Sequence, residues 1–322
     1  MASLLSVENL QVQFQTKKGI NTAVDGVSFS VEKGRILGIV GESGCGKSVT
    51  SMSILQLLGS NARISGGSIK LDGKELIGLP EKEMCRIRGN DIAMIFQDPM
   101  TALNPTLTIG TQLMEPIMLH QNCGKKEAWT RAVDVLKRVG IAAPEKRMKE
   151  YPHQLSGGMR QRVMIAMAVS CEPRLLIADE PTTALDVTIQ AQILELMCEL
   201  REKMGTAIML ITHDMGVVAE TADDVLVLYA GKAVEYGSIE DIFERPKHPY
   251  TQGLLNSIPR LDEDVELLNT IEGTVPAPDA MPAGCRFAPR CPYGKDRCMK
   301  EKPGVYHAGD SLVSCFRYEG EK

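Results

Sequence analysis

The sequence predicts an α/β fold with a mostly parallel core sheet, an added layer of antiparallel strands, a helical insertion and a small cysteine-rich C-terminal unit. The first observation behind this prediction is a set of apolar runs that end in polar residues and alternate with helical patterns, as buried parallel strands do. These runs occupy residues 36–40, 92–96, 175–178 and 208–212. The second is a group of N-terminal segments of strand-like composition, and the third is a tail rich in proline and cysteine.

The antiparallel layer is predicted near the N-terminus. Residues 4–14 and 23–31 show mixed alternation with β-branched residues, and residues 66–71 lead into an Asp72-Gly73 turn. Farther along, spaced apolar residues have helical periodicity and interrupt the alternation of strand and helix. We therefore expect a helical insertion at about residues 101–165.

The length of 322 residues suits roughly two domains. A hairpin predicted from residue 225, turning near Gly231, would close the first domain at residues 1–238. Prolines recur so often in residues 239–322 that long helices are excluded there. We expect this second domain to be compact, rich in loops and stabilised by a metal.

Composition and charge narrow the class of protein. With 24% charged and 43% hydrophobic residues the chain resembles an ordinary globular protein. The net charge of -5 argues against a protein that mainly grips nucleic acid. No apolar run approaches the length needed to cross a bilayer, and residues 1–10 lack a signal-peptide pattern, so we expect the chain to stay in the cytosol.

The segment Gly41-Glu42-Ser43-Gly44-Cys45-Gly46-Lys47-Ser48 is the most informative motif, because it lies between an apolar run and a helix-like stretch. Glycines let backbone N–H groups approach anionic oxygens closely, and the following helix directs its positive end toward them. Lys47 would serve the outer phosphates, and the Ser48 hydroxyl would serve Mg²⁺. A chance match is the alternative, but the strand-loop-helix context favours a nucleoside triphosphate site.

Two further motifs carry phosphate chemistry. The apolar run before Asp179-Glu180 ends in two carboxylates, which suit Mg²⁺ coordination by Asp179 and activation of a water molecule by Glu180. Solvated acids at a strand end are the alternative. In the segment 155–162, Ser156, Gly157 and Gly158 open a helix and could bind an anion, although an ordinary helix cap would look similar.

Together these motifs resemble an ABC-type ATPase. The phosphate loop (P-loop), Gln97 in Phe-Gln-Asp-Pro, Leu-Ser-Gly-Gly-Met at 155–159, Asp179-Glu180, Ala-Leu-Asp at 184–186 and His213 occur in family order. Met159 stands where Gln is commoner, which does not alter the Ser-Gly-Gly chemistry. The resemblance implies a P-loop NTPase core of ABC ATPase type and a head-to-tail dimer, in which ATP lies between the P-loop of one subunit and Ser156, Gly157 and Gly158 of the other.

The resemblance also assigns roles to residues. Gln97 would contact Mg²⁺ and the attacking water, His213 would touch the γ-phosphate, and Asp186 would communicate across the dimer. Lys47, Gln97, Glu180 and His213 would be the catalytic set, with Ser48, Gln97 and Asp179 around Mg²⁺. Phe14 is the candidate for stacking on adenine, and packing is its alternative. The expected nucleotide contacts are Phe14, Gly41, Ser43, Gly44, Cys45, Gly46, Lys47, Ser48 and Val49.

The segment Leu-Ser-Gly-Gly-Met-Arg-Gln-Arg, the later Lys247-His248-Pro249-Tyr250-Thr251 and the cysteine tail resemble ATPase subunits of dipeptide and oligopeptide importers. This resemblance implies ATP hydrolysis at the cytoplasmic face of the membrane that energises import. Its expected partners are a second, non-identical homologous ATPase, two transmembrane permeases and, indirectly, an extracytoplasmic solute-binding protein, with no nucleic acid. Import of nickel or another small solute is an alternative, and a soluble ABC ATPase without a transport role is another.

The tail cysteines suggest a metal centre. Their spacing is C-x5-C-x6-C-x16-C, and four thiolates could hold one Zn²⁺ or one [4Fe–4S] cluster. Tight zinc knuckles are absent, and members of the resembled subfamily carry a cluster here, so the resemblance favours [4Fe–4S] over Zn²⁺. The cluster could be structural or could respond to redox state. Its expected ligands are Cys285, Cys291, Cys298 and Cys315.

Overall fold

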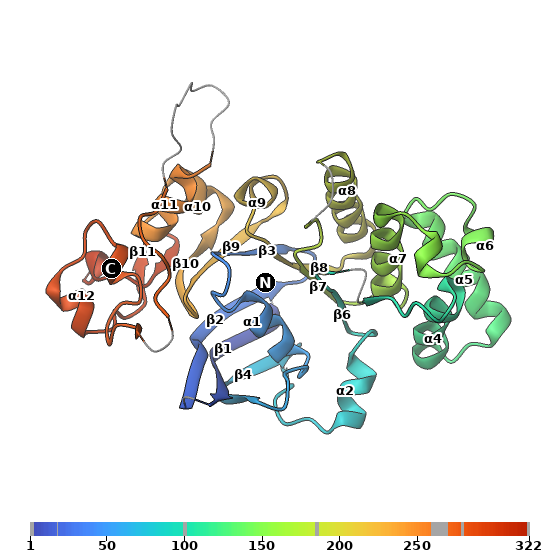
Figure 1. Ribbon diagram of the computed structural model, residues 1–322, viewed down its shortest axis with the longest axis horizontal. Coiled ribbons are helices and arrows are strands. Elements are labelled where there is room, and N and C mark those ends of the chain that lie inside the picture. The colour runs from blue at the N-terminus through green and yellow to red at the C-terminus, as the bar shows by residue number, and fades with distance from the viewer. Residues whose placement is uncertain are drawn as a thin grey trace.

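The computed structural model (Figure 1) describes residues 3–17, 19–98, 102–183, 187–258, 270–277 and 280–320. Two sheets organise the described chain. The larger has eight strands in the order β11, β12, β10, β9, β3, β8, β7, β6, and the smaller has four in the order β2, β1, β4, β5. The predicted α/β class is therefore confirmed.

The centre of the large sheet is parallel, as predicted. Strands β9, β3, β8, β7 and β6 all run in one direction. The parallel strands are β3 (Ile36–Val40), β6 (Ile92–Ile95), β7 (Leu175–Asp179), β8 (Ala207–Ile211) and β9 (Asp224–Tyr229). Alternate residues of β7 and β8 enter two different cores: Leu176 and Leu210 face one, whereas Ile177 and Met209 face the other. These strands are apolar on both faces because both faces are covered.

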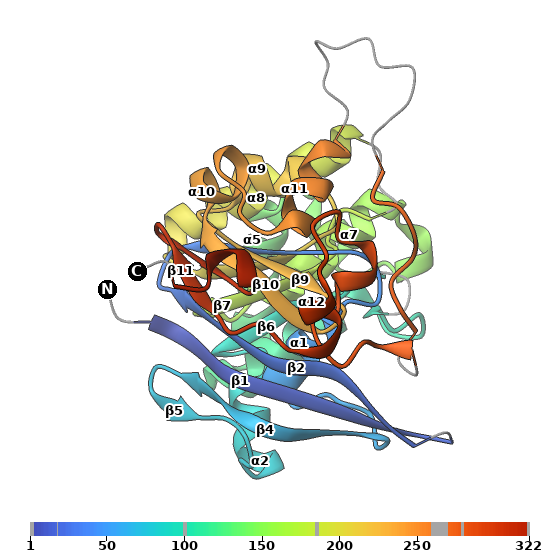
Figure 2. The ribbon, with the colours of Figure 1, turned by 90° about the vertical axis from the view of Figure 1, so that its left-hand side faces the viewer.

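The small sheet is fully antiparallel and forms a layer beneath the large one (Figure 2). Its strands are β1 (Ser3–Thr16), β2 (Gly19–Glu32), β4 (Ala62–Leu71) and β5 (Lys74–Glu75). Asp72 and Gly73 form the predicted turn with φ values of 50° and 81°, as a two-residue hairpin turn requires. Together with α1 (Lys47–Ile54) and α2 (Glu81–Ile87), the small sheet covers one face of the core sheet.

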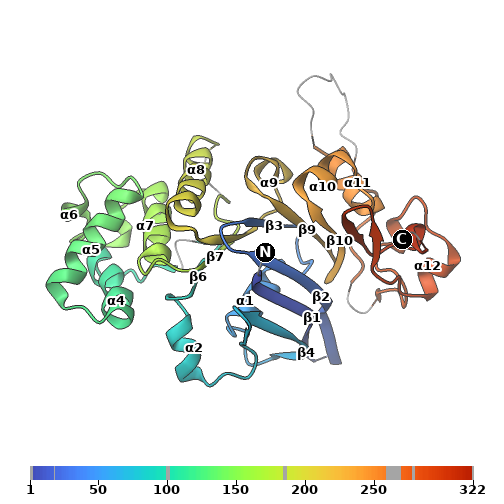
Figure 3. The same cartoon turned by 180° about the vertical axis from the view of Figure 1, so that it is seen from behind.

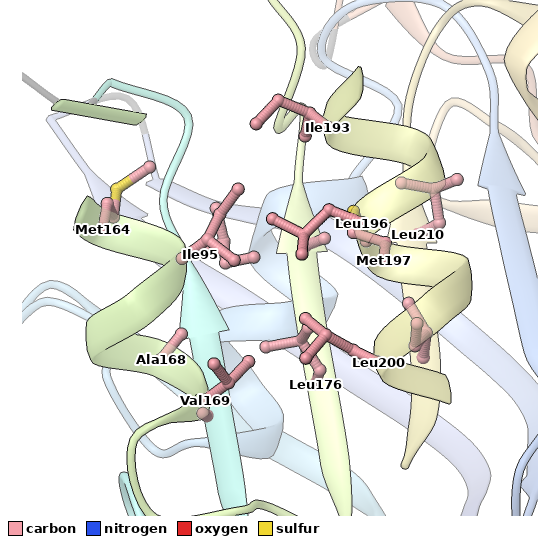
Figure 4. Close-up of a cluster of buried hydrophobic side chains, with 14 of the residues drawn as sticks. Ile95, Met164, Ala168, Val169, Leu176, Ile193, Leu196, Met197, Leu200 and Leu210 are labelled. Atoms are coloured by element: carbon pink, nitrogen blue, oxygen red, sulfur yellow. The ribbon is translucent and has the colours of Figure 1, made fainter. Parts of the chain in front are cut away.

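Helices cover the opposite face, and two of them anchor the site described below. Figure 4 shows α7 (Gly157–Val169) and α8 (Val187–Met204) packed on the parallel strands, with Ala168 and Leu200 directed toward Leu176 of β7. The helices α9 (Met215–Thr221), α10 (Ile239–Glu244) and α11 (Pro249–Asn256) lie beside α8 along the same face. This packing fixes the ends of the strands, where the functional motifs lie.

The predicted insertion is helical. It contains α4 (Ile109–Gln121), α5 (Lys125–Arg138), α6 (Pro144–Arg147) and the short 3-10 helix η1 (Pro152–Gln154) before α7. Figure 3 shows these helices at the end of the molecule opposite the C-terminal unit. Among the described residues no helix is long and apolar enough to span a membrane.

The C-terminal unit joins the core sheet. Strand β12 (Ser311–Val313) pairs with β10 (Lys232–Ser238), and β11 (Tyr306–Ala308) pairs with β12. Its other elements are short, as the prolines predict: η3 (Ala288–Arg290), α12 (Asp296–Lys300) and η4 (Phe316–Tyr318). The boundary at residue 238 remains a prediction, because one sheet contains strands from both sides of it.

Candidate nucleotide site

The P-loop, residues 41–48, connects β3 to α1 as its motif predicts. Gly41 has a φ of 149°, and a Cβ there would lie 2.1 Å from the Leu228 carbonyl oxygen. Gly46 has a φ of 99° and would meet the Ala23 carbonyl oxygen at 3.1 Å. A side chain at either position would therefore collide or strain the backbone. Ser43 and Gly44 are exposed, so this loop presents backbone to a ligand.

Lys47 lies across this loop. Its ammonium donates to the Gly41 carbonyl at 2.6 Å and to the Glu42 carbonyl at 3.2 Å, and the residue is only 6% exposed. Cys45 is fully buried beneath the loop, and burial raises the pKa of its thiol. Its role in the structure is thus packing, whereas the Lys47 side chain places a positive charge at the loop.

Asp179 and Ser48 form a pair suited to a magnesium ion. The Ser48 side chain hydrogen-bonds the Asp179 carboxyl, and burial raises the pKa of Asp179. Within the described chain, no hydrogen-bond partner reaches the buried Oδ1 atom of Asp179. A buried acceptor without a donor is costly, and a hard cation would satisfy it. These residues therefore fit Mg²⁺.

Glu180, Gln97 and His213 converge beside this pair. Gln97 Nε2 donates to Glu180 Oε2 at 3.1 Å, and His213 Nδ1 lies 3.4 Å from Glu180 Oε1. The Thr183 hydroxyl also donates to Glu180 Oε2, at 3.0 Å. Glu180 has a φ of 48°, a strained conformation for a non-glycine residue that is typical of functional sites. Thr183 was not predicted, and only its distance of three residues from Glu180 could have indicated it.

The Ser-Gly-Gly segment lies elsewhere on the chain. Ser156 is the N-cap of α7 and accepts from the Met159 N–H at 3.3 Å, while Gly157 is exposed with open space around the position of a Cβ. In the sheet, β8 and β7 separate β3, which leads into the P-loop, from β6, against which α7 packs. The structure thus brings Gln97, Glu180 and His213 together but places the Ser-Gly-Gly segment elsewhere, with Ser156 and Gly157 exposed and Gly158 half-buried against Ile189.

Three further residues were predicted to contact the nucleotide or the dimer partner. Val49 and Phe14 are half-buried and pack against the core of the small sheet. The adenine-stacking role of Phe14 remains a prediction. Asp186 lies outside the described residues.

The four tail cysteines gather around one cavity of about 80 Å³. Burial raises the pKa of Cys285 to about 11 and also raises the pKa values of Cys291 and Cys315, with neighbouring thiols adding to the effect. In the described part of the chain, no group of three or more His, Cys, Asp or Glu side chains has an arrangement that could hold a metal ion. The thiols therefore share a cavity without forming a preorganised metal site.

The sequence also missed two contacts from the C-terminal unit to the P-loop. The Glu42 N–H donates to the Tyr250 hydroxyl oxygen at 2.9 Å, and Arg290 donates to both carboxylate oxygens of Glu42 at 2.8 and 3.1 Å. Tyr250 belongs to a segment that the sequence singled out, but no pattern indicated its partner.

This P-loop, with the strand-end carboxylates beside it, defines a P-loop ATPase, and known proteins narrow the class to ABC transporters. Residues 24–183 match the ABC transporter family model. The dimeric ABC cassette MJ0796 in a post-hydrolysis state bound to ADP and Pi is similar in structure, with a TM-score of 0.66 and 27% identity over 73% of this chain and 98% of that one.

The tail and the relatives give the particular family. Residues 234–298 match the oligopeptide/dipeptide transporter C-terminal region. The oligopeptide transport ATP-binding protein AppD of Bacillus subtilis is 56% identical over 100% of this chain and 98% of its own length. The corresponding protein OppD of Escherichia coli is 52% identical over 98% and 93%. The chain belongs to the family of ABC transporter ATPases that carry this C-terminal region.

Proposed function

We propose that this chain binds and hydrolyses ATP to energise the import of dipeptides or oligopeptides through a membrane ABC transporter. The convergence of Gln97, Glu180 and His213 beside the P-loop is the observation that carries the hydrolysis. The peptide substrate is supported by relatives that match 98–100% of this chain and are named as oligopeptide or dipeptide transport proteins.

In this mechanism Lys47 exchanges its contacts with the Gly41 and Glu42 carbonyls for the outer phosphates of ATP. Glu180 accepts a proton from the attacking water, while Gln97 and His213, already in contact with its two oxygens, orient that carboxylate and the water. His213 also contacts the γ-phosphate.

Asp179, Ser48 and Gln97 would hold Mg²⁺. The orphaned Oδ1 atom of Asp179 and its contact with the Ser48 hydroxyl support this assignment. Bound Mg²⁺ neutralises phosphate charge as it develops during hydrolysis. Asp179 supplies the buried acceptor, and Ser48 keeps that carboxyl aimed at the loop.

A second ATPase subunit completes the site. Ser156, Gly157 and Gly158 would bind ATP held by the partner's P-loop, and Asp186 would communicate across the interface. ATP closes this dimer and hydrolysis reopens it. We expect the partner to be a non-identical homologue, and adenine to stack on Phe14.

A groove beside Gln97 suits a segment of a transmembrane permease. It has a volume of about 250 Å³ and is lined by Leu57, Phe96, Leu103, Pro116 and Met167, among others. Leu57 and Phe96 are 40% and 38% exposed, so the groove presents apolar surface that a partner could cover. Because Gln97 follows Phe96 directly, movement at the nucleotide would reach the groove. The chain would therefore sit at the cytoplasmic face of the membrane, bound to two permeases.

We also propose that Cys285, Cys291, Cys298 and Cys315 hold a [4Fe–4S] cluster, with Zn²⁺ as the alternative. Their shared cavity supports a four-thiolate site, and bound metal would offset the burial that raises their pKa values. Iron and sulfide analysis of anaerobically purified protein should give about four of each per chain, as one [4Fe–4S] cluster requires. Cys291→Ser should lower both, with Cys85→Ser as the matched control. Stoichiometric zinc without sulfide would contradict the cluster.

Copurification tests the function as a whole. The tagged chain is extracted from membranes in mild detergent, and the expected companions are two multi-helix membrane proteins and a second ATPase. Phe96→Asp should reduce recovery of the membrane proteins, whereas Ile20→Asp, at a 58% exposed position outside the groove, should not. The accompanying solute-binding protein is then tested with peptides and nickel. Recovery of ribosomes or DNA-repair proteins, or of no membrane protein, would contradict transport.

A further inference from the structure

The contacts between the C-terminal unit and the P-loop have a consequence for ATP binding. We infer that Arg290 and Tyr250 are positioning residues, which hold the P-loop ready for ATP through Glu42. The inference extends the proposed ATPase function and is argued from this chain's own side chains.

Arg290 is built into this position. Its side chain is only 6% exposed, and its guanidinium forms a bidentate pair with the Glu42 carboxylate. Arg290 Nε also donates to the Glu272 carbonyl at 2.9 Å, and Nη2 donates to the Ile271 carbonyl at 3.1 Å. These backbone contacts fix the planar group before it meets Glu42. A bidentate arginine-carboxylate pair with both partners ordered is strong and sets orientation as well as distance.

Tyr250 holds the backbone of the same residue. Its side chain is fully buried, with its ring edge-on to those of Tyr229 and Phe287. Burial raises the pKa of the hydroxyl, which therefore stays neutral and accepts from the Glu42 N–H. The second residue of the P-loop is thus held by its backbone and by its side chain at once.

A second contact secures the other side of the loop. Arg286 donates to Asp25 Oδ2 at 3.1 Å and to the Ala230 carbonyl. The next residue, Gly231, donates its N–H to the Cys45 carbonyl inside the P-loop at 2.9 Å. Arg286 and Arg290 both lie between Cys285 and Cys291, so one short segment of the C-terminal unit supports the loop at two points.

The physical effect has two parts. A glycine-rich loop loses conformational entropy when it orders around phosphate, and external contacts reduce that loss by ordering it in advance. Glu42 is also a carboxylate beside a site for a polyanion, and its charge would repel ATP if Arg290 did not neutralise it. Removal of Arg290 therefore exposes a repulsive charge, and removal of Glu42 as well should abolish that repulsion.

The test is a double-mutant cycle on the full-length chain, read as the dissociation constant of ATP. Arg290→Gln should weaken ATP binding about tenfold, as loss of a charged hydrogen-bond pair predicts. Glu42→Gln with Arg290→Gln should restore only the part of the affinity lost to charge repulsion, because the contact that orders the loop is still missing. In the assembled transporter, the single variant should raise KM for ATP with little change in kcat, because it alters binding and not the reacting groups.

Matched controls separate positioning from general damage. Arg297 forms a similar pair with Glu319 within the same unit, away from the P-loop, so Arg297→Gln should leave ATP affinity unchanged. Tyr250→Phe removes only the hydroxyl that accepts from Glu42 and should weaken binding several-fold. Tyr236→Phe, which loses a bond to the Ser30 carbonyl, should not. If Arg290→Gln does not fold, Tyr250→Phe still tests whether contacts with Glu42 position the P-loop.

Unchanged ATP affinity in folded Arg290→Gln and Tyr250→Phe would overturn the inference. So would full recovery of ATP affinity in the double variant, or an equal loss in Arg297→Gln. Failure of the transport proposal would look different, because it would appear in copurification while the ATP dissociation constants still followed this cycle.

Discussion

The P-loop and the Ser-Gly-Gly segment use the same chemistry, since each places backbone N–H groups and a hydroxyl at the start of a helix. They differ in how many contacts from the rest of the chain hold them in place. The P-loop is closed in by Leu228 and Ala23, crossed by Lys47 and held at Glu42 by the C-terminal unit. Ser156 and Gly157 are exposed at the start of α7.

This difference indicates a division of labour. A loop that is ordered by contacts within one chain can bind a nucleotide without help, because much of the entropy cost of ordering it is already met. An exposed helix start has little affinity alone and gains it when another surface supplies the rest of the ligand. We therefore expect defects at the P-loop to appear in ATP binding by the isolated chain, and defects at the Ser-Gly-Gly segment to appear only in the assembled dimer.

The largest effect should come from Glu180→Gln. The amide keeps the shape of the side chain but cannot accept a proton, so turnover should fall about a thousandfold. ATP affinity should stay near that of the parent, and ATP should trap the closed dimer, which size-exclusion chromatography and ATPase assays can measure. Glu199→Gln, an exposed change in α8, is the control. Normal turnover by Glu180→Gln would refute its role as the base.

The next effect tests the comparison itself. Lys47→Ala should weaken ATP binding by the isolated chain about a hundredfold, because it removes a charged group that contacts phosphate. Gly157→Asp should leave that binding unchanged, since its Cβ enters open space and a carboxylate suits a helix N-terminus. In the assembled transporter Gly157→Asp should lower ATP turnover as severely as Lys47→Ala, because its charge would repel phosphate. Weakened ATP binding by the isolated Gly157→Asp chain would contradict the claim that the Ser-Gly-Gly segment acts only in the assembled dimer.

Much of the site could be predicted because it depends on local order. The motif at 41–48 implies its own strand-loop-helix context, and Glu180 and Gln97 follow strands that pair in parallel. The ends of parallel strands meet at one edge of a sheet, so their side chains become neighbours. The strained backbone of Glu180 and the contact from Thr183 add detail that spacing alone does not carry.

The contacts of the C-terminal unit could not be predicted in the same way. Tyr250 and Arg290 meet Glu42 across 208 and 248 residues. Tyr250 reaches it from α11, whereas the segment that carries Arg290 is held to the nucleotide domain by Arg286, which contacts Asp25 and the Ala230 carbonyl. No periodicity in the tail specifies these contacts. The sequence predicted the four cysteines as metal ligands, but no pattern indicated that two arginines between the first two cysteines reach the nucleotide domain.

The smallest expected effect is a pH dependence of stability in α11, the helix whose Tyr250 contacts the P-loop. His248 caps α11, which carries Tyr250, and it is buried with its Nδ1 accepting from the Tyr250 N–H at 3.1 Å. Burial, with a contribution from Arg317, lowers the pKa of His248 to about 3. Its imidazole is neutral in the folded chain and protonates near pH 6.5 when unfolded. Stability is therefore complete above pH 6.5 and is lost as pH falls toward 3.

At pH 5 this group alone should cost about 2 kcal/mol of folding free energy relative to pH 7.5. His248→Asn keeps an acceptor for the cap but cannot protonate, so it should remove that part of the acid sensitivity, whereas exposed His307→Asn should not. Urea unfolding of the parent and both variants at the two pH values measures the difference. Because the Tyr250 hydroxyl that contacts Glu42 belongs to α11, acid should weaken ATP binding before it affects α7. Equal acid sensitivity in the parent and His248→Asn would show that another group controls the C-terminal unit.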